Sequence, residues 1–164
     1  MSGSVLKCAV ISPCGLYRYW LERTWSDEPP LPIIMLNPST ADADIDDRTI
    51  GRCVALARRA ERGGIVVCNL YALRSTDPKN LRKAEDPIGP ENNGYLQDLA
   101  DMAARTGVPI VCAWGVHASQ DRSTYALMLI RSRHATAVCL SLTKHGNPGH
   151  PLYLRGDLPF LPFS

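Results

Sequence analysis

Short apolar runs alternate with amphipathic segments along most of the chain. The amphipathic segments have the spacing of helices, and the apolar runs have the length of strands. Most of these runs are rich in Val and Ile, as strands covered on both faces of a parallel sheet tend to be. Five runs are expected to form strands: Leu6–Ser12, Ile33–Asn37, Gly64–Leu70, Val108–Trp114 and Thr136–Leu142.

Three helices are expected between these strands. The first begins near Asp46 or Asp47, either of which is a good N-cap, and the pair Gly63-Gly64 ends it. The other two are expected at Glu91–Arg105 and Ser119–Arg133.

The alternation of strands and helices predicts a three-layer α/β/α sandwich with a central, mostly parallel sheet. The chain has 164 residues, enough to bury one core, so we expect a single domain over residues 1–164. The segment Tyr17–Trp25 fits either an added antiparallel strand or a short helix. The proline-containing tail, Asp157–Ser164, is expected to pack as an extended segment.

Composition narrows the class of protein only modestly. Hydrophobic residues make up 45% of the chain and charged residues 21%, which is ordinary for a soluble globular protein. A net charge of +2 does not by itself indicate nucleic-acid binding, although a local basic face remains open. No apolar run reaches membrane-spanning length and no signal peptide is evident, so we expect a cytoplasmic protein without membrane contact. Six cysteines occur singly, which favours reduced core thiols over a metal site.

Polar residues stand at the ends of several predicted strands. Asn37 and Pro38 end one strand, Asn69 ends the next, and the last strand runs into a glycine- and proline-rich loop with His145 and His150. Ligands of parallel α/β sheets bind at the carboxyl ends of the strands, so two asparagines and a histidine could share one pocket. Each alone is more often a turn, cap or loop residue, and their convergence is what favours a site.

Four motifs stand in order within residues 32–155: LNPS (Leu36–Ser39), GIVVCNLYAL (Gly64–Leu73), VCAWGVHA (Val111–Ala118) and HPLYL (His150–Leu154). Together they resemble the motifs of the uracil-DNA glycosylase superfamily. Any one of them is weak, whereas four in order are more specific. The first and last also resemble a family of short bacterial and phage proteins. The resemblance implies a uracil-DNA glycosylase-like fold and a DNA glycosylase without metal or cofactor.

The resemblance also implies a role for each matching residue. Asn69 would read the edge of the base, because an amide offers both a donor and an acceptor. His150 would donate a hydrogen bond to the departing base. Asn37 would hold the attacking water without acting as a general base, since an amide takes up no proton at neutral pH. Pro38 and Ser39 would contact the base.

Two departures from the superfamily pattern affect specificity. Ser39 stands where the uracil-specific branch often has an aromatic residue, which enlarges the pocket near the 5-position of a pyrimidine. The closing HPLYL loop lacks the serine that follows His-Pro in the standard motif, which removes one expected phosphate contact. Both departures favour a modified pyrimidine over plain uracil.

The partner that the resemblance implies is single- or double-stranded DNA, bound by a monomer. Leu154 matches the position of the residue that fills the vacated base stack, and Tyr153 lies beside it. An exposed loop leucine is otherwise a packing residue. The basic stretch from residue 74 to 83, with Arg74 and Lys79, is the candidate for phosphate contacts.

A run of four aspartates is unusual for a DNA-binding protein, because carboxylates repel phosphate. Helix capping accounts for one or two of them. The others could bind a metal or a cationic group of a substrate, and the sequence does not decide. The four residues are Asp42, Asp44, Asp46 and Asp47.

These features favour a DNA glycosylase that flips a modified pyrimidine out of the helix, in DNA repair or in defence against phages with altered bases. Two alternatives remain. One is a hydrolase of free modified nucleotides or nucleosides, and the other is a non-catalytic protein that binds modified nucleic acid.

Overall fold

A computed structural model describes residues 3–164 as a mixed α/β fold around a seven-stranded sheet. In chain order the elements are β1 (Leu6–Ile11), β2 (Arg18–Thr24), β3 (Leu31–Met35), α1 (Arg48–Arg59), β4 (Gly64–Asn69), α2 (Lys79–Lys83), α3 (Asn92–Thr106), β5 (Ile110–Cys112), α4 (Gln120–Ser132), β6 (Ala137–Cys139), the 3₁₀ helix η1 (Pro151–Tyr153) and β7 (Leu161–Pro162).

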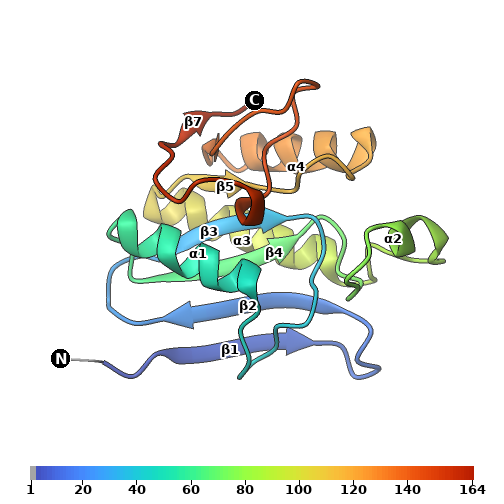
Figure 1. Cartoon of the computed structure of the whole chain (residues 1–164), viewed down its shortest axis with the longest axis horizontal. Helices are drawn as coiled ribbons and strands as arrows, with labels where there is room; N and C mark the ends of the chain where they lie inside the picture. The colour runs from blue at the N-terminus through green and yellow to red at the C-terminus, as the bar shows by residue number, and fades with distance from the viewer. Residues whose placement is uncertain (1–2) are drawn as a thin grey trace.

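Four parallel strands, in the order β4-β3-β5-β6, form the centre of the sheet. On one side β2 pairs antiparallel with β4, and β1 pairs antiparallel with β2. On the other side β7 pairs antiparallel with β6 (Figure 1). The parallel sheet that the sequence predicts is therefore present as a central block, with antiparallel strands at both edges.

Both faces of the sheet are covered. Side chains alternate between the faces of a strand, so Ile33 and Ile65 pack on the side of α1, while Ile34 and Val66 pack on the side of α3 and α4. The buried apolar residues accordingly form two clusters, one on each face. Helix α1 lies in front of the sheet and α3 behind it in Figure 1. This arrangement confirms the predicted layers.

The three predicted helices form close to their expected bounds. Asp47 caps α1 by accepting a hydrogen bond from the Ile50 amide at 2.9 Å. Ser119 caps α4 in the same way through the Arg122 amide, and Gly107 ends α3 in the left-handed region at φ 72°. Helix α2 is an additional short helix that the hydrophobic periodicity of the sequence does not predict.

One predicted strand has another place in the sheet than expected, and one segment of undecided structure forms a strand. The expected strand at Leu6–Ser12 is an antiparallel edge strand with an exposed first half, and not a strand covered on both faces. Apolar content does not reveal this position, because edge and central strands can share the same residues. The segment Tyr17–Trp25 forms strand β2, and the tail contributes the short strand β7.

The cysteines divide into two groups. Four are buried, as expected of core thiols, whereas Cys8 and Cys14 are exposed, and all six are free. None of the helices within residues 3–164 has the length and apolar character needed to cross a membrane.

Candidate functional site

The connections of the sheet reverse direction at β3 and β5. The chain leaves β3 toward β4 on one side and leaves β5 toward β6 on the other. The carboxyl ends of β3 and β5 therefore form a topological switch point, where open α/β sheets bind their ligands. A cavity of about 500 Å³ lies at this edge of the sheet.

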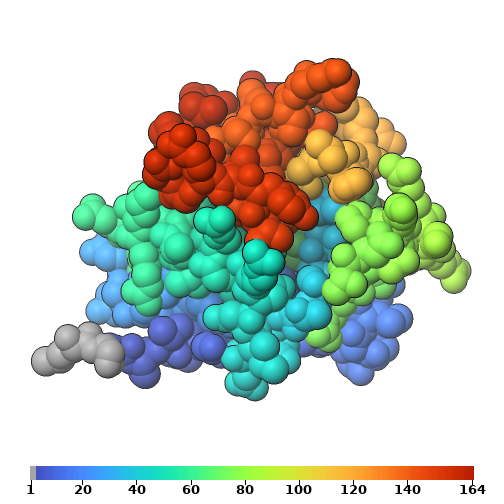
Figure 2. Space-filling model, viewed as in Figure 1, coloured from blue at the N-terminus to red at the C-terminus, as the bar shows by residue number. Residues whose placement is uncertain are grey.

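The cavity wall comes from segments far apart in the sequence. Asn37, Pro38 and Ser39 follow β3, and further residues follow β4, β5 and β6. Figure 2 shows this face of the molecule hollowed between these segments. Further polar residues outside the motifs also line the cavity: Thr49, Ser75, Thr76, Ser141 and Thr143.

Asn37 lines the cavity, and backbone carbonyls hold one end of its side chain. Its Nδ2 donates to the backbone carbonyls of Pro38 at 3.1 Å, Leu73 at 3.2 Å and Ser75 at 2.9 Å. These carbonyls can only accept, so they fix the orientation of the amide and leave Oδ1 as a free acceptor in the described part of the chain. Asn37 thus has a structural role, tying residues 73–75 to the end of β3, and also offers an acceptor to a ligand or water.

The loop after β6 brings His150 to the same cavity. The Gly149 amide donates to the Ser141 carbonyl at 3.0 Å, and the Gly115 amide donates to the Pro148 carbonyl at 2.8 Å. Gly149 leaves no room for a side chain, since a Cβ there would lie 2.3 Å from Ser141 Oγ. These contacts hold His150 beside the end of β5.

The backbone also fixes the tautomer of His150. Its Nδ1 accepts a hydrogen bond from the Leu152 amide at 3.2 Å, so the proton of the neutral imidazole is on Nε2. Burial lowers the pKa of His150, and the carboxylate of Asp47 opposes this shift. At pH 7 the ring is therefore neutral, with a single N–H to donate.

Arg18 is a charged residue of the cavity wall that the motifs did not reveal. Only 2% of its surface is exposed. The register between β1 and β2 shifts after Val10, which leaves Tyr19 as the extra residue of a β-bulge. Bulges redirect neighbouring side chains, and here Arg18 lies on the α1 face, where its Nη1 donates to the Ala41 carbonyl at 2.8 Å.

Asn69, the expected base reader, ends β4 but does not line the cavity. It is 1% exposed, and neither polar atom of its side chain has a partner among the described residues. Its neighbour in the sheet register, Met35, does line the cavity. By alternation with Val67, the Asn69 side chain is on the α1 face, as is Arg18. Contact between Asn69 and a base stays a prediction.

Polar side chains hold the carboxyl end of β4 from the opposite face. Nδ2 of Asn92 donates to the carbonyls of Asn69 at 2.9 Å and Leu70 at 3.2 Å. Arg122 donates to the Leu70 carbonyl through Nε at 3.0 Å and Nη2 at 2.6 Å. Helices α3 and α4 are thus anchored to the strand that carries Asn69. In the sequence these two residues look like ordinary helix positions.

The mouth of the cavity carries exposed apolar side chains. Val116, Leu142 and Tyr153 line it, and Tyr153 is 83% exposed. Leu154 is partly buried against the core and also lines the cavity, and its insertion into a base stack stays a prediction. Tyr153, whose ring centre lies 5.6 Å from that of His150, is the more exposed of the two.

The predicted basic contacts lie beside the cavity. Arg74 and Lys79 do not line it but flank Ser75, Thr76 and Pro78, which do. Lys79 is exposed as the first residue of α2. A role in phosphate contacts stays a prediction for both.

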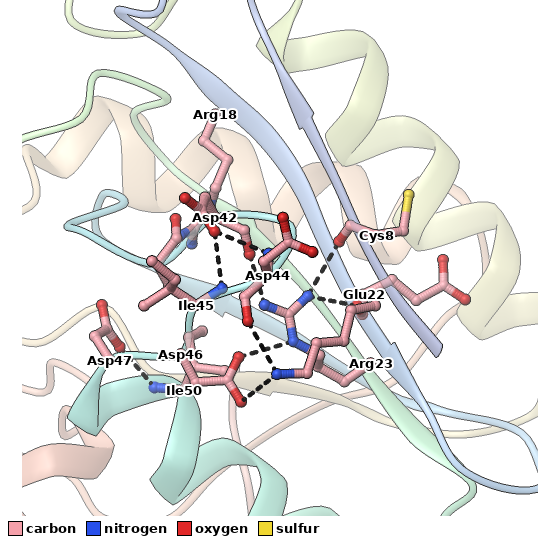
Figure 3. A network of polar contacts seen from close by, with 12 residues as sticks. Cys8, Arg18, Glu22, Arg23, Asp42, Asp44, Ile45, Asp46, Asp47 and Ile50 are labelled. Carbon is pink, nitrogen blue, oxygen red and sulfur yellow. Dashed lines mark hydrogen bonds and ion pairs between the residues drawn. The ribbon is translucent and has the colours of Figure 1, made fainter. Parts of the chain in front are cut away.

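The acidic run mainly holds the loop before α1 (Figure 3). Asp42 Oδ1 accepts from the Asp44 amide at 2.8 Å, and Asp46 pairs with Arg23 at 2.8 Å. Asp47 is the cap of α1 and the one member of the run that lines the cavity. Within residues 3–164, no three His, Cys, Asp or Glu side chains gather in a way that could hold a metal ion.

Comparison with known proteins shows that most of the chain, including most of the cavity wall, matches one protein family. A family model described as "Protein of unknown function (DUF1643)" matches residues 18–152. This segment contains every residue that lines the cavity except Tyr153 and Leu154, and it leaves out the edge strands β1 and β7. No curated protein matches the chain.

Proposed function

We propose that this chain, which belongs to the DUF1643 family of proteins of unknown function, is a DNA glycosylase that hydrolyses the N-glycosidic bond of a pyrimidine nucleotide. Its α/β architecture, with a cavity at the switch point, is compatible with the uracil-DNA glycosylase superfamily that its motifs resemble. The expected base carries a substituent at its 5-position. Such an activity would serve DNA repair or defence against phages with altered bases.

The proposal rests on Asn37 and His150, which line the same cavity. Backbone hydrogen bonds leave Asn37 with a free acceptor and His150 with a free donor. Asn37 keeps a free acceptor, Oδ1, after its NH2 group has bound three carbonyls. His150 keeps a single donor, Nε2–H, after the Leu152 amide has occupied Nδ1. Hydrolysis of a glycosidic bond needs an acceptor to hold the water and a donor at the leaving group.

The reaction replaces the bond from the sugar C1′ to the base nitrogen with a bond from C1′ to the water oxygen. The electron pair of the broken bond goes to the base, where the Nε2–H of His150 stabilises the negative charge. Oδ1 of Asn37 accepts a hydrogen bond from the water and turns a lone pair of the water toward C1′. The water's surplus proton ends on the base or in solvent. Asn37 adds no charge near the sugar cation, so stabilisation of the leaving base is expected to dominate.

The mouth of the cavity suits a nucleotide that has left the base stack. Turning a nucleotide out of DNA costs about a few kcal/mol. The exposed side chains of Val116, Leu142 and Tyr153 can offset part of this cost by contact with the neighbouring bases. Tyr153 is the candidate for the stacking contact, because it is aromatic and the most exposed of the three.

Substrate length separates this proposal from its rivals. The protein is incubated with oligonucleotides that carry normal and 5-substituted pyrimidines, and with the matching mononucleotides, and the released base and abasic sites are measured. Release from DNA but not from mononucleotides is expected. Release from mononucleotides alone would indicate a nucleotide hydrolase, and tight DNA binding without release would indicate a non-catalytic binding protein.

A further inference from the structure

We infer that Arg18 forms an anion subsite in the cavity, which takes a phosphate or carboxylate group of the bound substrate. This inference depends on the proposed function only in that the cavity is taken as the substrate site. It adds that the part of the substrate reaching this buried wall is negatively charged.

Arg18 is a buried cation without an anionic partner. It makes no ion pair in the described part of the chain, and the one hydrogen bond of its side chain there joins Nη1 to the Ala41 carbonyl. Burial lowers the pKa of Arg18 to about 10, with Asp47 raising it, so the guanidinium is charged at neutral pH. A buried charge without a partner opposes folding unless a ligand completes its contacts.

Arg23, on the same strand, shows what a satisfied buried arginine looks like in this fold. Arg23 is 1% exposed and donates to the Asp46 carboxylate and to the carbonyls of Cys8, Glu22 and Asp42 (Figure 3). Burial alone therefore does not explain the missing partners of Arg18. The difference is that Arg18 lines the cavity and Arg23 does not.

The free atoms of Arg18 match the geometry of an oxyanion. Its Nε is buried without a partner, and its Nη2 makes no hydrogen bond within residues 3–164. Nε–H and Nη2–H form one edge of the planar guanidinium, which binds two oxygens of a carboxylate or phosphate at once.

Two sources could supply the anion. A flipped nucleotide enters base first, so the anionic group would be a substituent of the base. A free nucleotide can bring its own 5′-phosphate. The first source agrees with the enlarged pocket at Ser39 and with action on DNA, and the second agrees with a nucleotide hydrolase.

Paired probes, of which one member carries an additional anionic group, test the subsite. Binding to the full chain is measured by titration calorimetry for 5-carboxyuracil against thymine, and for deoxyuridine 5′-monophosphate against deoxyuridine. We expect the anionic member of at least one pair to bind about 10-fold to 100-fold more tightly, as for a hydrogen-bonded charge. The pair that shows the preference identifies the source of the anion.

Variants assign the preference to Arg18. Arg18→Gln is expected to abolish it, whereas Arg105→Gln, which removes one exposed charge from the end of α3, should keep it. If Arg18→Gln does not fold, the affinities of the wild type at low and high salt still test the subsite. A preference for the anionic probe that arises from charge should weaken as the salt concentration rises. The absence of a preference in both pairs, absence of binding included, or its persistence in folded Arg18→Gln, would overturn the subsite. Because no base release is measured, these outcomes are independent of glycosylase activity.

Discussion

At the scale of single residues, backbone groups decide which atom of a polar side chain stays free to bind a ligand. Three carbonyls hold the NH2 group of Asn37, and one amide occupies Nδ1 of His150. An asparagine and a histidine, each able both to donate and to accept, are thereby reduced to one acceptor and one donor. This selection is the basis of the proposed chemistry.

The lowered pKa of His150 predicts a pH-dependent stability. His150 binds a proton less readily in the folded state than in the unfolded chain, whose ordinary value is 6.5. The unfolded state therefore takes up more protons as the pH falls below about 6.5, and the free energy of unfolding decreases there. The stabilisation by neutral His150 is fully present above that pH. Urea unfolding between pH 5 and 8 measures the slope.

Two variants isolate this effect. His150→Ala should lose the part of the slope that belongs to His150, while His145→Ala, which removes an exposed histidine of the same loop, should keep the wild-type slope. Identical pH dependence in the wild type and His150→Ala would contradict the shifted pKa.

Ser39 is expected to control the size of the accepted base. Ser39 lines the cavity directly after Pro38, which fixes the chain direction at this point. Ser39→Tyr should selectively slow the cleavage of bulky 5-substituted pyrimidines, because a packed pocket cannot absorb a ring. The ratio of single-turnover rates for 5-substituted and plain bases is the measurement. An unchanged ratio would mean that Ser39 does not face the base.

The sequence predicts part of this site. Asn37, Ser39 and His150 follow strand ends within motifs, and all three line the cavity. Arg18 could not be found in this way, because a β-bulge depends on the register of the partner strand. Leu154 packs partly against the core that α1 helps to form, a contact between distant segments that local sequence does not encode.

At the scale of elements, strand β2 and the loop before α1 are joined through Arg23. Its guanidinium reaches Asp46 and the Asp42 carbonyl across the face of the sheet. This loop leads into α1 and contributes Asp47 to the cavity wall. The aspartate run, which is unusual for a DNA-binding protein, thus helps to fix the position of the loop that brings Asp47 to the cavity.

An asymmetry between the two partners of this ion pair is expected. Arg23→Ala should lower the free energy of unfolding by about 2 to 4 kcal/mol, because it removes four hydrogen bonds of a fully buried guanidinium, three of them to partly buried carbonyls. Asp46→Asn should lower it by less than about 1 kcal/mol, since the Asp46 side chain is 34% exposed and screened by water. Chemical denaturation measures both values. Equal losses would contradict the view that Arg23 is the organising residue.

Helices are the elements that the sequence predicts best, and the order of strands is what it leaves open. Caps such as Asp47 and Ser119 are local signals, and they place α1 and α4 to within a few residues. The neighbours of a strand depend on contacts between distant segments. The position of β2 between β1 and β4 therefore emerges only from the fold.

At the scale of the whole molecule, the nearly balanced charge does not show where the basic residues lie. The net charge is +2, yet basic residues follow the loop beside the cavity mouth, at Arg74, Lys79, Arg82 and Lys83. A cavity beside a basic rim suits a polyanion whose reacting group enters while its backbone stays outside.

The salt dependence of DNA binding tests this rim. Arg74→Ala and Lys79→Ala should each weaken binding and reduce the slope of log affinity against log salt concentration by about 0.7 to 0.9, the effect of one lost phosphate contact. Arg105→Ala, on the exposed end of α3, is the matched control and should leave the slope unchanged. Wild-type slopes in both rim variants would remove these residues from the DNA contact.

The most direct test of the central claim is the single-turnover rate of abasic-site formation in an oligonucleotide with a 5-substituted pyrimidine. The wild type should release the base, and Asn37→Ala and His150→Ala should each be about 10²-fold slower with DNA affinity little changed. Asn147→Ala, on the same loop as His150 but outside the cavity wall, should retain the wild-type rate. No abasic sites with any base of the panel, or wild-type rates in both folded cavity variants, would contradict the assignment of this cavity as a glycosylase active site.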